Sequence, residues 1–409
     1  MKSKAITVAV FLACSLQLYA QQADSASRTL MQRCLGWPCS RSMLMNHPWK
    51  PALGGLQTSQ PLSQPAHGDD TATYVTFDVP GGARDIFPAG INPAGTVAGW
   101  YSTQNFTFHG FLRTPDGIIT TFDPPGSTNT NVGAGGEALG GPPINAAGAI
   151  AGFYVDASGP YHGFVRSPDG SFTSFDAPGA VNGTGFDCCI SPAGTVAGVA
   201  FDANSIGHGF LRAPDGTFSS FDPPGSVLTS AAGMSPARVI AGWYYDANFA
   251  QHGFLRDRDS TITVFDAPGA VYGTVTSGIS ASGVIDGTYF DASFVGHGFL
   301  RSRDGTFTTF DPAGSAGFGT TVIGNNPEGA IVGYYYDANG FFHSFLRTPE
   351  GAITGFDPPG SIGSVASAIN PAGVIAGYYY DASGATHGYL RVRDESAKRS
   401  AGKTTEAVD

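Results

Sequence analysis

The sequence predicts an all-β fold: a seven-bladed β-propeller with four antiparallel strands in each blade. Two motifs, each repeated seven times about 45 residues apart, carry this prediction. One is His-Gly-Phe-Leu-Arg, first met at His109–Arg113, and the other is Phe-Asp-x-Pro/Ala-Gly, first met at Phe77–Gly81. Such a period, built from short strands and tight turns, is typical of propellers. Apolar residues do not recur at helical spacing between residues 73 and 394.

The stretch that begins at Gly273 shows how one repeat is built. It predicts strands over Gly273–Ser280, Val284–Phe290, Gly296–Ser302 and Thr306–Asp311. Turns rich in Gly, Asp, Ser and Pro separate these strands, because such residues supply the backbone angles that hairpins require. Each repeat is therefore expected to form one blade.

The two ends of the repeat region predict how the ring closes. The last repeat stops after His387–Arg391 and lacks its fourth strand, whereas the strand Tyr74–Asp78 arrives without the three that should precede it. We expect the N-terminal strand to complete the last blade, which removes two exposed sheet edges.

The repeated pattern resembles a known family. A small residue, then Gly-x-Ile/Val-x-Gly, a turn and His-Gly-Phe-Leu look like the bacterial extracellular repeats of the HAF family, named for His-Ala-Phe. Here Gly110 or Ser344 stands in place of the Ala. The resemblance covers residues 73–393. It implies secretion and a propeller-like fold, and it implies no established activity.

The composition and net charge of the chain limit the classes of partner that it could bind. The chain has 409 residues with 21 basic and 32 acidic side chains, a formal net charge of −11, and no basic cluster. This argues against nucleic acid and against anionic membranes as partners. Although the length suggests two or three domains, repeats stack into one body. We expect a monomer that needs no cofactor.

The N-terminus predicts export from a bacterial cell. Residues 1–20 resemble a secretory signal peptide, with Lys2 and Lys4 before the apolar run Ala5–Leu16 and a small residue, Ala20, at the end. We expect a secreted, periplasmic or cell-surface protein with no transmembrane segment once the signal is removed. Whether the leader anchors the ring to a membrane or wall stays open.

The rest of the chain outside the repeats is expected to be flexible. Residues 21–72 form a linker rich in Ser, Gln, Pro and Gly, with a short helix predicted over Met31–Met45, and residues 394–409 form a disordered polar tail. The propeller itself occupies residues 73–393.

Each repeated His precedes an Asp by the same spacing, which places the two opposite one another on adjacent strands. We interpret the pairs as a buried hydrogen-bond network resembling the Asp/His networks of WD40 propellers. The pairs are His109–Asp123, His162–Asp176, His208–Asp222, His252–Asp266, His297–Asp311, His343–Asp357 and, through ring closure, His387–Asp78.

A second Asp lies six residues before the His in six repeats, so each His is expected between two carboxylates; the first repeat has Thr103 there. Catalytic His–Asp pairs and one metal ion per blade are the alternatives. Because identical copies on every blade do not make one active site, we assign no catalytic residue and no metal site.

The other recurrent or unusual residues also carry expectations. The Arg that ends each His-Gly-Phe-Leu-Arg motif is expected to form solvated pairs with acids near the Pro-Asp-Gly turns. Cys34 and Cys39 are close enough to close a disulfide loop. The adjacent Cys188 and Cys189 are expected to be free, partly buried thiols, with a vicinal disulfide as the alternative.

Function is predicted from one face of the ring, where the turns after the second strands meet the linkers between blades. Aromatic residues near polar turns suit sugar stacking, although they would equally pack between blades. The candidate ligand-binding residues are Trp100, Tyr154, Trp243, Tyr244, Tyr335, Tyr379 and Glu137.

The sequence therefore predicts a binding or protein-interaction module for a surface glycan or protein. The alternative is an extracellular hydrolase or lyase acting on a polysaccharide or other polymer. Three departures from the repeat mark where symmetry breaks: the insertion Asn129–Pro143 with its Glu137, the Cys188-Cys189 pair, and Arg238 in place of a turn Gly.

Overall fold

The computed structural model describes residues 72–81, 83–133, 141–185 and 189–393. The predicted signal peptide, the helix over Met31–Met45, the Cys34–Cys39 disulfide, Glu137 and the tail all lie outside these residues. Regular structure in the described ranges consists of β-strands, and no helix occurs there. No membrane-crossing helix is therefore found in this part of the chain.

The strands follow the repeats, and each group of four is called a unit here. The first unit holds β2 (Asp85–Ile91), β3 (Val97–Ser102), β4 (Phe108–Arg113) and β5 (Ile119–Phe122). The second holds β6 (Ser127–Val132), β7 (Ile150–Asp156), β8 (Tyr161–Arg166) and β9 (Phe172–Phe175). The third holds β10 (Gly183–Gly185), β11 (Val196–Phe201), β12 (Gly207–Arg212) and β13 (Phe218–Phe221).

The next three units repeat the order. The fourth holds β14 (Ser226–Met234), β15 (Ile240–Asp246), β16 (Gln251–Arg256) and β17 (Ile262–Phe265). The fifth holds β18 (Gly273–Ile279), β19 (Ile285–Phe290), β20 (Gly296–Arg301) and β21 (Phe307–Phe310). The sixth holds β22 (Thr320–Asn325), β23 (Ile331–Tyr336), β24 (Phe342–Arg347) and β25 (Ile353–Phe356).

The last unit combines the two ends of the repeat region. It holds β26 (Ser361–Ile369), β27 (Ile375–Asp381) and β28 (Thr386–Arg393), and β1 (Ala72–Phe77) pairs antiparallel with β28 as its outermost strand. The register places Tyr74 opposite Arg391 and Phe77 opposite Gly388. The predicted pairing of the N-terminal strand with the last repeat is therefore present.

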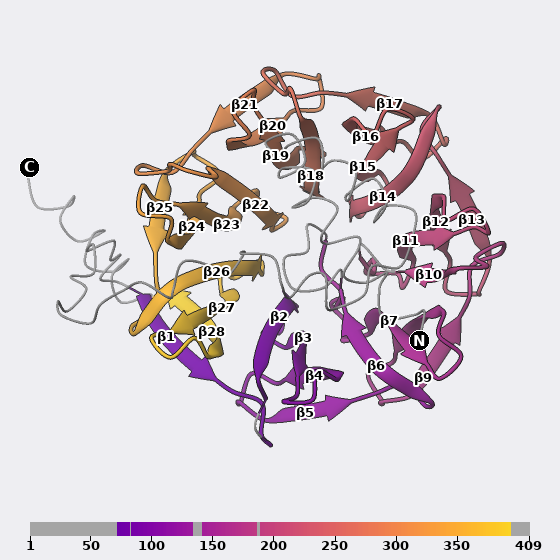
Figure 1. Cartoon of the computed structure of the whole chain (residues 1–409), viewed down its shortest axis with the longest axis horizontal. Coiled ribbons are helices and arrows are strands. Elements are labelled where there is room, and N and C mark those ends of the chain that lie inside the picture. Colours follow the sequence, from indigo (N-terminus) through magenta and orange to yellow (C-terminus); the bar gives the residue numbers. More distant parts are fainter. Residues whose placement is uncertain (1–71, 82, 134–140, 186–188, 394–409) are drawn as a thin grey trace, which may run out of the picture. The chain divides into compact units, whose positions relative to one another are not determined.

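The units are antiparallel sheets in a propeller-like arrangement, with the first strand of each unit nearest the middle (Figure 1). Units three to five join into one extended sheet only through single parallel pairs, Gly207 with Leu228 and Gln251 with Gly273. The prediction of an all-β, propeller-like protein with four-stranded sheets is confirmed, and the strands predicted for the fifth unit match within two residues.

Glycine in the repeated motifs makes room for a buried ring. A Cβ on Gly287 would lie 2.8 Å from the ring of Phe299, and one on Gly298 would lie 2.6 Å from the ring of Phe310. The two rings lie on opposite faces of the sheet, because Gly298 and Phe299 are consecutive on one strand, so a larger residue at either glycine would collide with a ring. This explains why the motif reads His-Gly-Phe.

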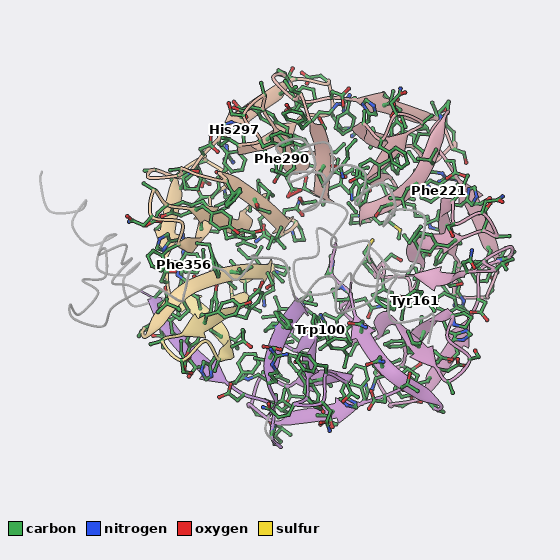
Figure 2. The ribbon with its side chains drawn as sticks, in the orientation of Figure 1. Trp100, Tyr161, Phe221, Phe290, His297 and Phe356 are labelled. Carbon is green, nitrogen blue, oxygen red and sulfur yellow. The ribbon has the colours of Figure 1, made fainter. Side chains whose placement is uncertain are left out.

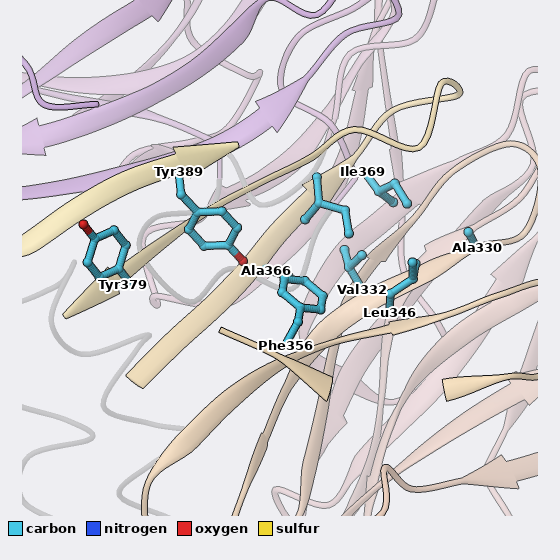
Figure 3. Packing of buried hydrophobic residues seen from close by; sticks show 9 residues of the cluster. Ala330, Val332, Leu346, Phe356, Ala366, Ile369, Tyr379 and Tyr389 are labelled. Carbon is cyan, nitrogen blue, oxygen red and sulfur yellow. The ribbon is translucent and has the colours of Figure 1, made fainter. Parts of the chain in front are cut away.

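The apolar core lies between neighbouring units. In one cluster, Leu346 and Phe356 of the sixth unit pack against Ala366, Ile369 and Tyr389 of the seventh (Figure 3). Equivalent clusters recur at other junctions. Because every unit buries one face against the next, the repeats stabilise each other.

Candidate functional site

The repeated His and Asp residues form the predicted pairs. In every unit the His Nδ1 lies 2.6–3.0 Å from a carboxylate oxygen of the Asp fourteen residues later, or of Asp78 for His387. The His Nε2 lies 3.4–3.9 Å from the preceding Asp in units two to seven. In the first unit Thr107 Oγ1 takes that place at 3.1 Å, rather than the expected Thr103.

The prediction that this network is buried is only partly correct. His343 is the most enclosed, with its side chain 10% exposed, whereas His208 is 39% exposed. The difference arises because these pairs sit where each sheet meets its turns. The hydrogen bond that His343 donates to Asp357 raises the pKa of His343 against the opposing effect of burial. Burial lowers the pKa of His387, but hydrogen bonds to Asp78 and Asp381 outweigh it and the net shift is upward.

The Asp of the pair also reaches the next unit. The hydroxyl of Thr130 on β6 donates to Asp123 Oδ1 at 2.6 Å, and Ser364 on β26 donates to Asp357 Oδ1 at 2.6 Å. Thr229 and Thr320 make the same bond. The network therefore joins the outer strand of one unit to the inner strand of the next, which is a structural role.

The expectation for the repeated Arg is only partly correct, because the turn acids act on it electrostatically but its close contact is a ring. Each guanidinium lies over a Phe ring of the preceding unit, with its carbon 4.6–5.3 Å from the ring centroid. Arg113 over Phe77 is 6% exposed, so it is not a solvated partner of the turn acids. Burial lowers the pKa of Arg113, while the Asp116 carboxylate opposes that shift. Stacking between units is worth more than a surface ion pair.

The aromatic residues predicted to bind a ligand are buried. Six of the seven lie in the described ranges, and each is at most 8% exposed: Trp100, Tyr154, Trp243, Tyr244, Tyr335 and Tyr379. Trp100 stacks on Phe87, and four of the Tyr rings lie 5.1–5.4 Å from the ring of the repeated His. Figure 2 shows Trp100 among the side chains of the first unit. This is the packing between strands that the sequence left as the alternative, and it leaves no face of these rings for a sugar.

The thiol expectation also needs correction. Cys189 is 2% exposed and disulfide-bonded, so it is not a free thiol. It packs with Ala197, Phe221 and Ala231 at the junction of the third and fourth units.

The predicted face nevertheless carries other aromatic residues. Phe249 (52% exposed) follows β15, Phe318 (64%) precedes β22, and Val271 (60%) precedes β18. Tyr272 stacks on Phe294 with 3.5 Å between ring centroids and 11° between planes. We call these five residues the aromatic arc.

The turns that carry the aromatic arc adjoin one another over units four to six. Gln251 beside the Phe249 turn bridges to Gly273, next to Tyr272. Gly296, which closely follows Phe294, bridges to Gly319, next to Phe318. Exposed apolar groups on adjoining turns form the kind of patch that marks an interaction site.

Two of the aromatic side chains occupy turn positions that favour glycine. The φ angle is 62° at Phe249 and 63° at Phe294, where the equivalent turns of other units have Gly159, Gly340 or Gly384. A bulky residue in this region costs about 1–2 kcal/mol, and such strain gathers at functional sites. Their positions in the repeat could have identified them, because Phe stands there, as Phe106 does in the first unit, where the remaining units have Gly or Ser.

Sequence reasoning also missed a polar pair in the core. Asp286 on β19 is fully buried, and Asn325 Nδ2 on β22 donates to its Oδ1 at 2.7 Å. Burial raises the pKa of Asp286 to about 7. The equivalents of Asp286 in the other units are small or branched apolar residues: Ala98, Ala151, Ala197, Ala241, Val332 and Ala376, each 0% exposed. Aligning the repeats position by position would have revealed both residues.

The sheets and their inter-unit networks define a propeller-like, all-β repeat protein. Solved structures of similar fold include two lyases. A streptogramin B lyase structure matches with a TM-score of 0.52 and 14% identity over 78% of this chain and 97% of that chain. A catalytically inactive virginiamycin B lyase from Staphylococcus aureus with quinupristin matches with a TM-score of 0.53 and 12% identity over 78% and 99%.

These likenesses concern the fold alone. A Dos1 propeller aligns at a TM-score of 0.45 with 10% identity, over 77% of this chain and 93% of that one. No family model matches the chain. No curated protein matches it either.

Proposed function

We propose that this protein is a secreted, seven-bladed propeller of the HAF type that binds carbohydrate through the aromatic arc. The observation that carries the proposal is a set of exposed and half-buried apolar side chains on adjoining turns, four of them aromatic, with Phe249 and Phe294 in a strained backbone conformation. Aromatic rings bind the apolar faces of sugar rings, and carboxylate and amide groups bind their hydroxyls. The arc offers both, since Asp246 and Asn248 share the turn of Phe249.

Ring closure is part of the proposal and would give the arc a rigid base. Beyond the pairing of β1 with β28, contacts between the last and first units support it. Asn370 Nδ2 donates to the carbonyl of Asn92 at 3.2 Å, and the backbone NH of Ile86 donates to Thr386 Oγ1 at 3.2 Å. Sites on rigid elements hold their geometry better than sites on isolated loops.

The hydrolase or lyase alternative is not carried forward. The His–Asp pairs recur with one geometry in successive units, which is the mark of a structural repeat. Among the residues that the structure describes, no cluster of three or more His, Cys, Asp or Glu could hold a metal ion.

The sharpest test replaces Phe249 by the glycine that other units use. We expect Phe249→Gly to leave the free energy of unfolding unchanged or raise it by up to about 1 kcal/mol, because the backbone strain is relieved. Carbohydrate binding, found first on a glycan array with the purified protein, should weaken about tenfold or more, as loss of a stacking ring predicts.

Ser205 supplies the matched control. It occupies the same turn position in the third unit with a φ of 64°, but has no ring to lose. Ser205→Gly should show the same stability effect and unchanged binding. Equal carbohydrate affinity in the Phe249→Gly and Ser205→Gly variants, or silence across the array, would contradict the proposal.

A further inference from the structure

Three arginines converge on one cavity at the junction of the third and fourth units. The cavity has a volume of about 290 Å³ and is lined by Leu211, Arg238, Arg256 and Arg258. Arg238 lies in the turn between β14 and β15, and Arg258 lies in the turn between β16 and β17. These turns are at the ends of the strands away from the aromatic arc. We call this cavity the arginine pocket.

Arg238 is particular to this unit, and Arg258 departs from the proline that four of the other units have. Arg238 stands where six other units have a turn glycine: Gly95, Gly148, Gly194, Gly283, Gly329 and Gly373. Arg258 stands where Pro115, Pro168, Pro214 and Pro349 stand in other units. Only the third arginine, Arg256, belongs to the repeat.

The backbone of the fourth unit is strained at both turns. The φ angle is 62° at Arg238 and 72° at Ser260, and the position of Ser260 is a glycine in units one, two, three, five and six. A side chain in this region is retained where it has a use, because glycine would be less costly. Both strained turns border the arginine pocket, so these departures from the repeat all lie beside the same cavity.

Arg256 is held rigidly in the wall. Its Nη2 donates to Ser260 Oγ at 2.8 Å, and its guanidinium carbon lies 5.3 Å from the centroid of Phe221. In units one and six the equivalent Arg113 and Arg347 instead donate to the carbonyl of the next residue. Ser260 therefore redirects the arginine, and a fixed guanidinium binds an anion at little cost in conformational entropy.

Within the described residues, the three arginines of the pocket form no close ion pair with a carboxylate. Neither Arg238 nor Arg256 nor Arg258 has a carboxylate oxygen within 4.0 Å there, since the one arginine–carboxylate ion pair found in these ranges joins Arg84 to Asp85. The nearby carboxylate of Asp259 accepts the backbone NH of Thr261 at 3.0 Å and so stabilises its own turn. Three guanidinium groups around one cavity can donate hydrogen bonds to an anion, while Asp257 and Asp259 flank Arg258 in its turn.

We propose that the arginine pocket binds an oxyanion: a carboxylate, sulfate or phosphate group. Guanidinium groups bind such groups through paired, charge-assisted hydrogen bonds. Leu211 gives the pocket one apolar wall, which fits an organic acid or ester better than a bare ion. The site is independent of the proposed carbohydrate function, because it uses other turns and other residues.

The test titrates the full-length protein with inorganic phosphate, inorganic sulfate and an oligogalacturonate at low ionic strength, by calorimetry and by thermal shift. We expect binding of at least one probe, weakened by added salt. The Arg238→Gly and Arg258→Pro variants, which restore the residues of other units, should each reduce affinity by about tenfold or more, as loss of a charge-assisted hydrogen bond predicts. Strong preference for the oligogalacturonate would identify the ligand as a carboxylate-bearing polymer. Preference for phosphate or sulfate would identify it as a phosphate or sulfate ester.

Arg303 supplies the matched control. It is exposed at the turn position of Arg258 in the fifth unit, where Gly283 replaces the second arginine. Arg303→Pro should bind the probe like the unmodified protein. If no probe binds, or if the Arg238→Gly and Arg258→Pro variants bind as tightly as the Arg303→Pro variant, the proposal is wrong.

Discussion

The Asp286→Asn variant is expected to lose a large part of the pH dependence of stability. The pKa of Asp286 in the folded protein is raised by burial to about 7, above the ordinary value of 3.8. The folded state therefore keeps a proton that the unfolded state releases. The stability that comes from retaining this proton is fully present below pH 3.8. It is lost as the pH rises to about 7, so the carboxyl group destabilises the folded protein at neutral pH and above.

The expected size follows from the linkage relation. Between pH 5 and pH 8 the unmodified protein should lose about 2–3 kcal/mol of unfolding free energy through this group alone. Urea denaturation of both proteins at the two pH values would measure it. Asp286→Asn keeps the size of the side chain and a carbonyl acceptor for Asn325. Between pH 5 and pH 8 the unfolding free energy of the variant should therefore fall by about 2–3 kcal/mol less than that of the unmodified protein.

A second variant separates titration from packing. Asp286→Ala combined with Asn325→Ile restores the apolar residues found at these positions in most other units, and it leaves no buried polar atom unpaired. It should be more stable than the unmodified protein at pH 8. Identical pH profiles for all three proteins would show that Asp286 does not retain its proton in the folded state.

The Asp357→Ala variant is expected to lose about 2–4 kcal/mol of stability, because it removes the nearest acceptor of two buried donors. Asp357 accepts hydrogen bonds from His343 and Ser364, and both of these residues are at most 8% exposed. Ser364 in turn bonds Ser344, whose hydroxyl lies 2.9 Å from that of the fully buried Tyr389. The change therefore disrupts a network that joins two units.

Asp176→Ala is the matched control. Asp176 makes the equivalent contact with His162, at 2.8 Å, but its side chain is 58% exposed, so the loss should stay below about 1 kcal/mol. Urea denaturation of both variants would compare them. Similar losses of unfolding free energy in the two variants would contradict the view that burial determines how much each His–Asp pair stabilises the protein.

The pH dependence gives a further check on Asp357. The pKa of His343 is raised above its ordinary value, chiefly by the hydrogen bond to Asp357. The stability from the charged imidazole is fully present below pH 6.5 and is lost as the pH rises through the folded-state pKa. The cost of Asp357→Ala should therefore be larger at pH 6 than at pH 8.5.

Periodic spacing made part of the site predictable. The fourteen-residue step from His to Asp holds because a hairpin of fixed length places the two on adjacent strands, as between His297 and Asp311. The aromatic residues failed as binding residues because alternation along a strand does not tell which face another sheet will cover. Tyr335 is 1% exposed for that reason, whereas Phe249 on a turn is 52% exposed.

The sequence by itself determined the repeat, the β-strands, their antiparallel order and the partners of the histidines, because these depend on local spacing and turn chemistry. Only the tertiary structure decided what happens between units. The stacking of Arg113 on Phe77, the pairing of Asp286 with Asn325 and the meeting of Arg238 with Arg258 all join residues from different strands or units. Such contacts follow from how whole sheets pack, which no local pattern encodes.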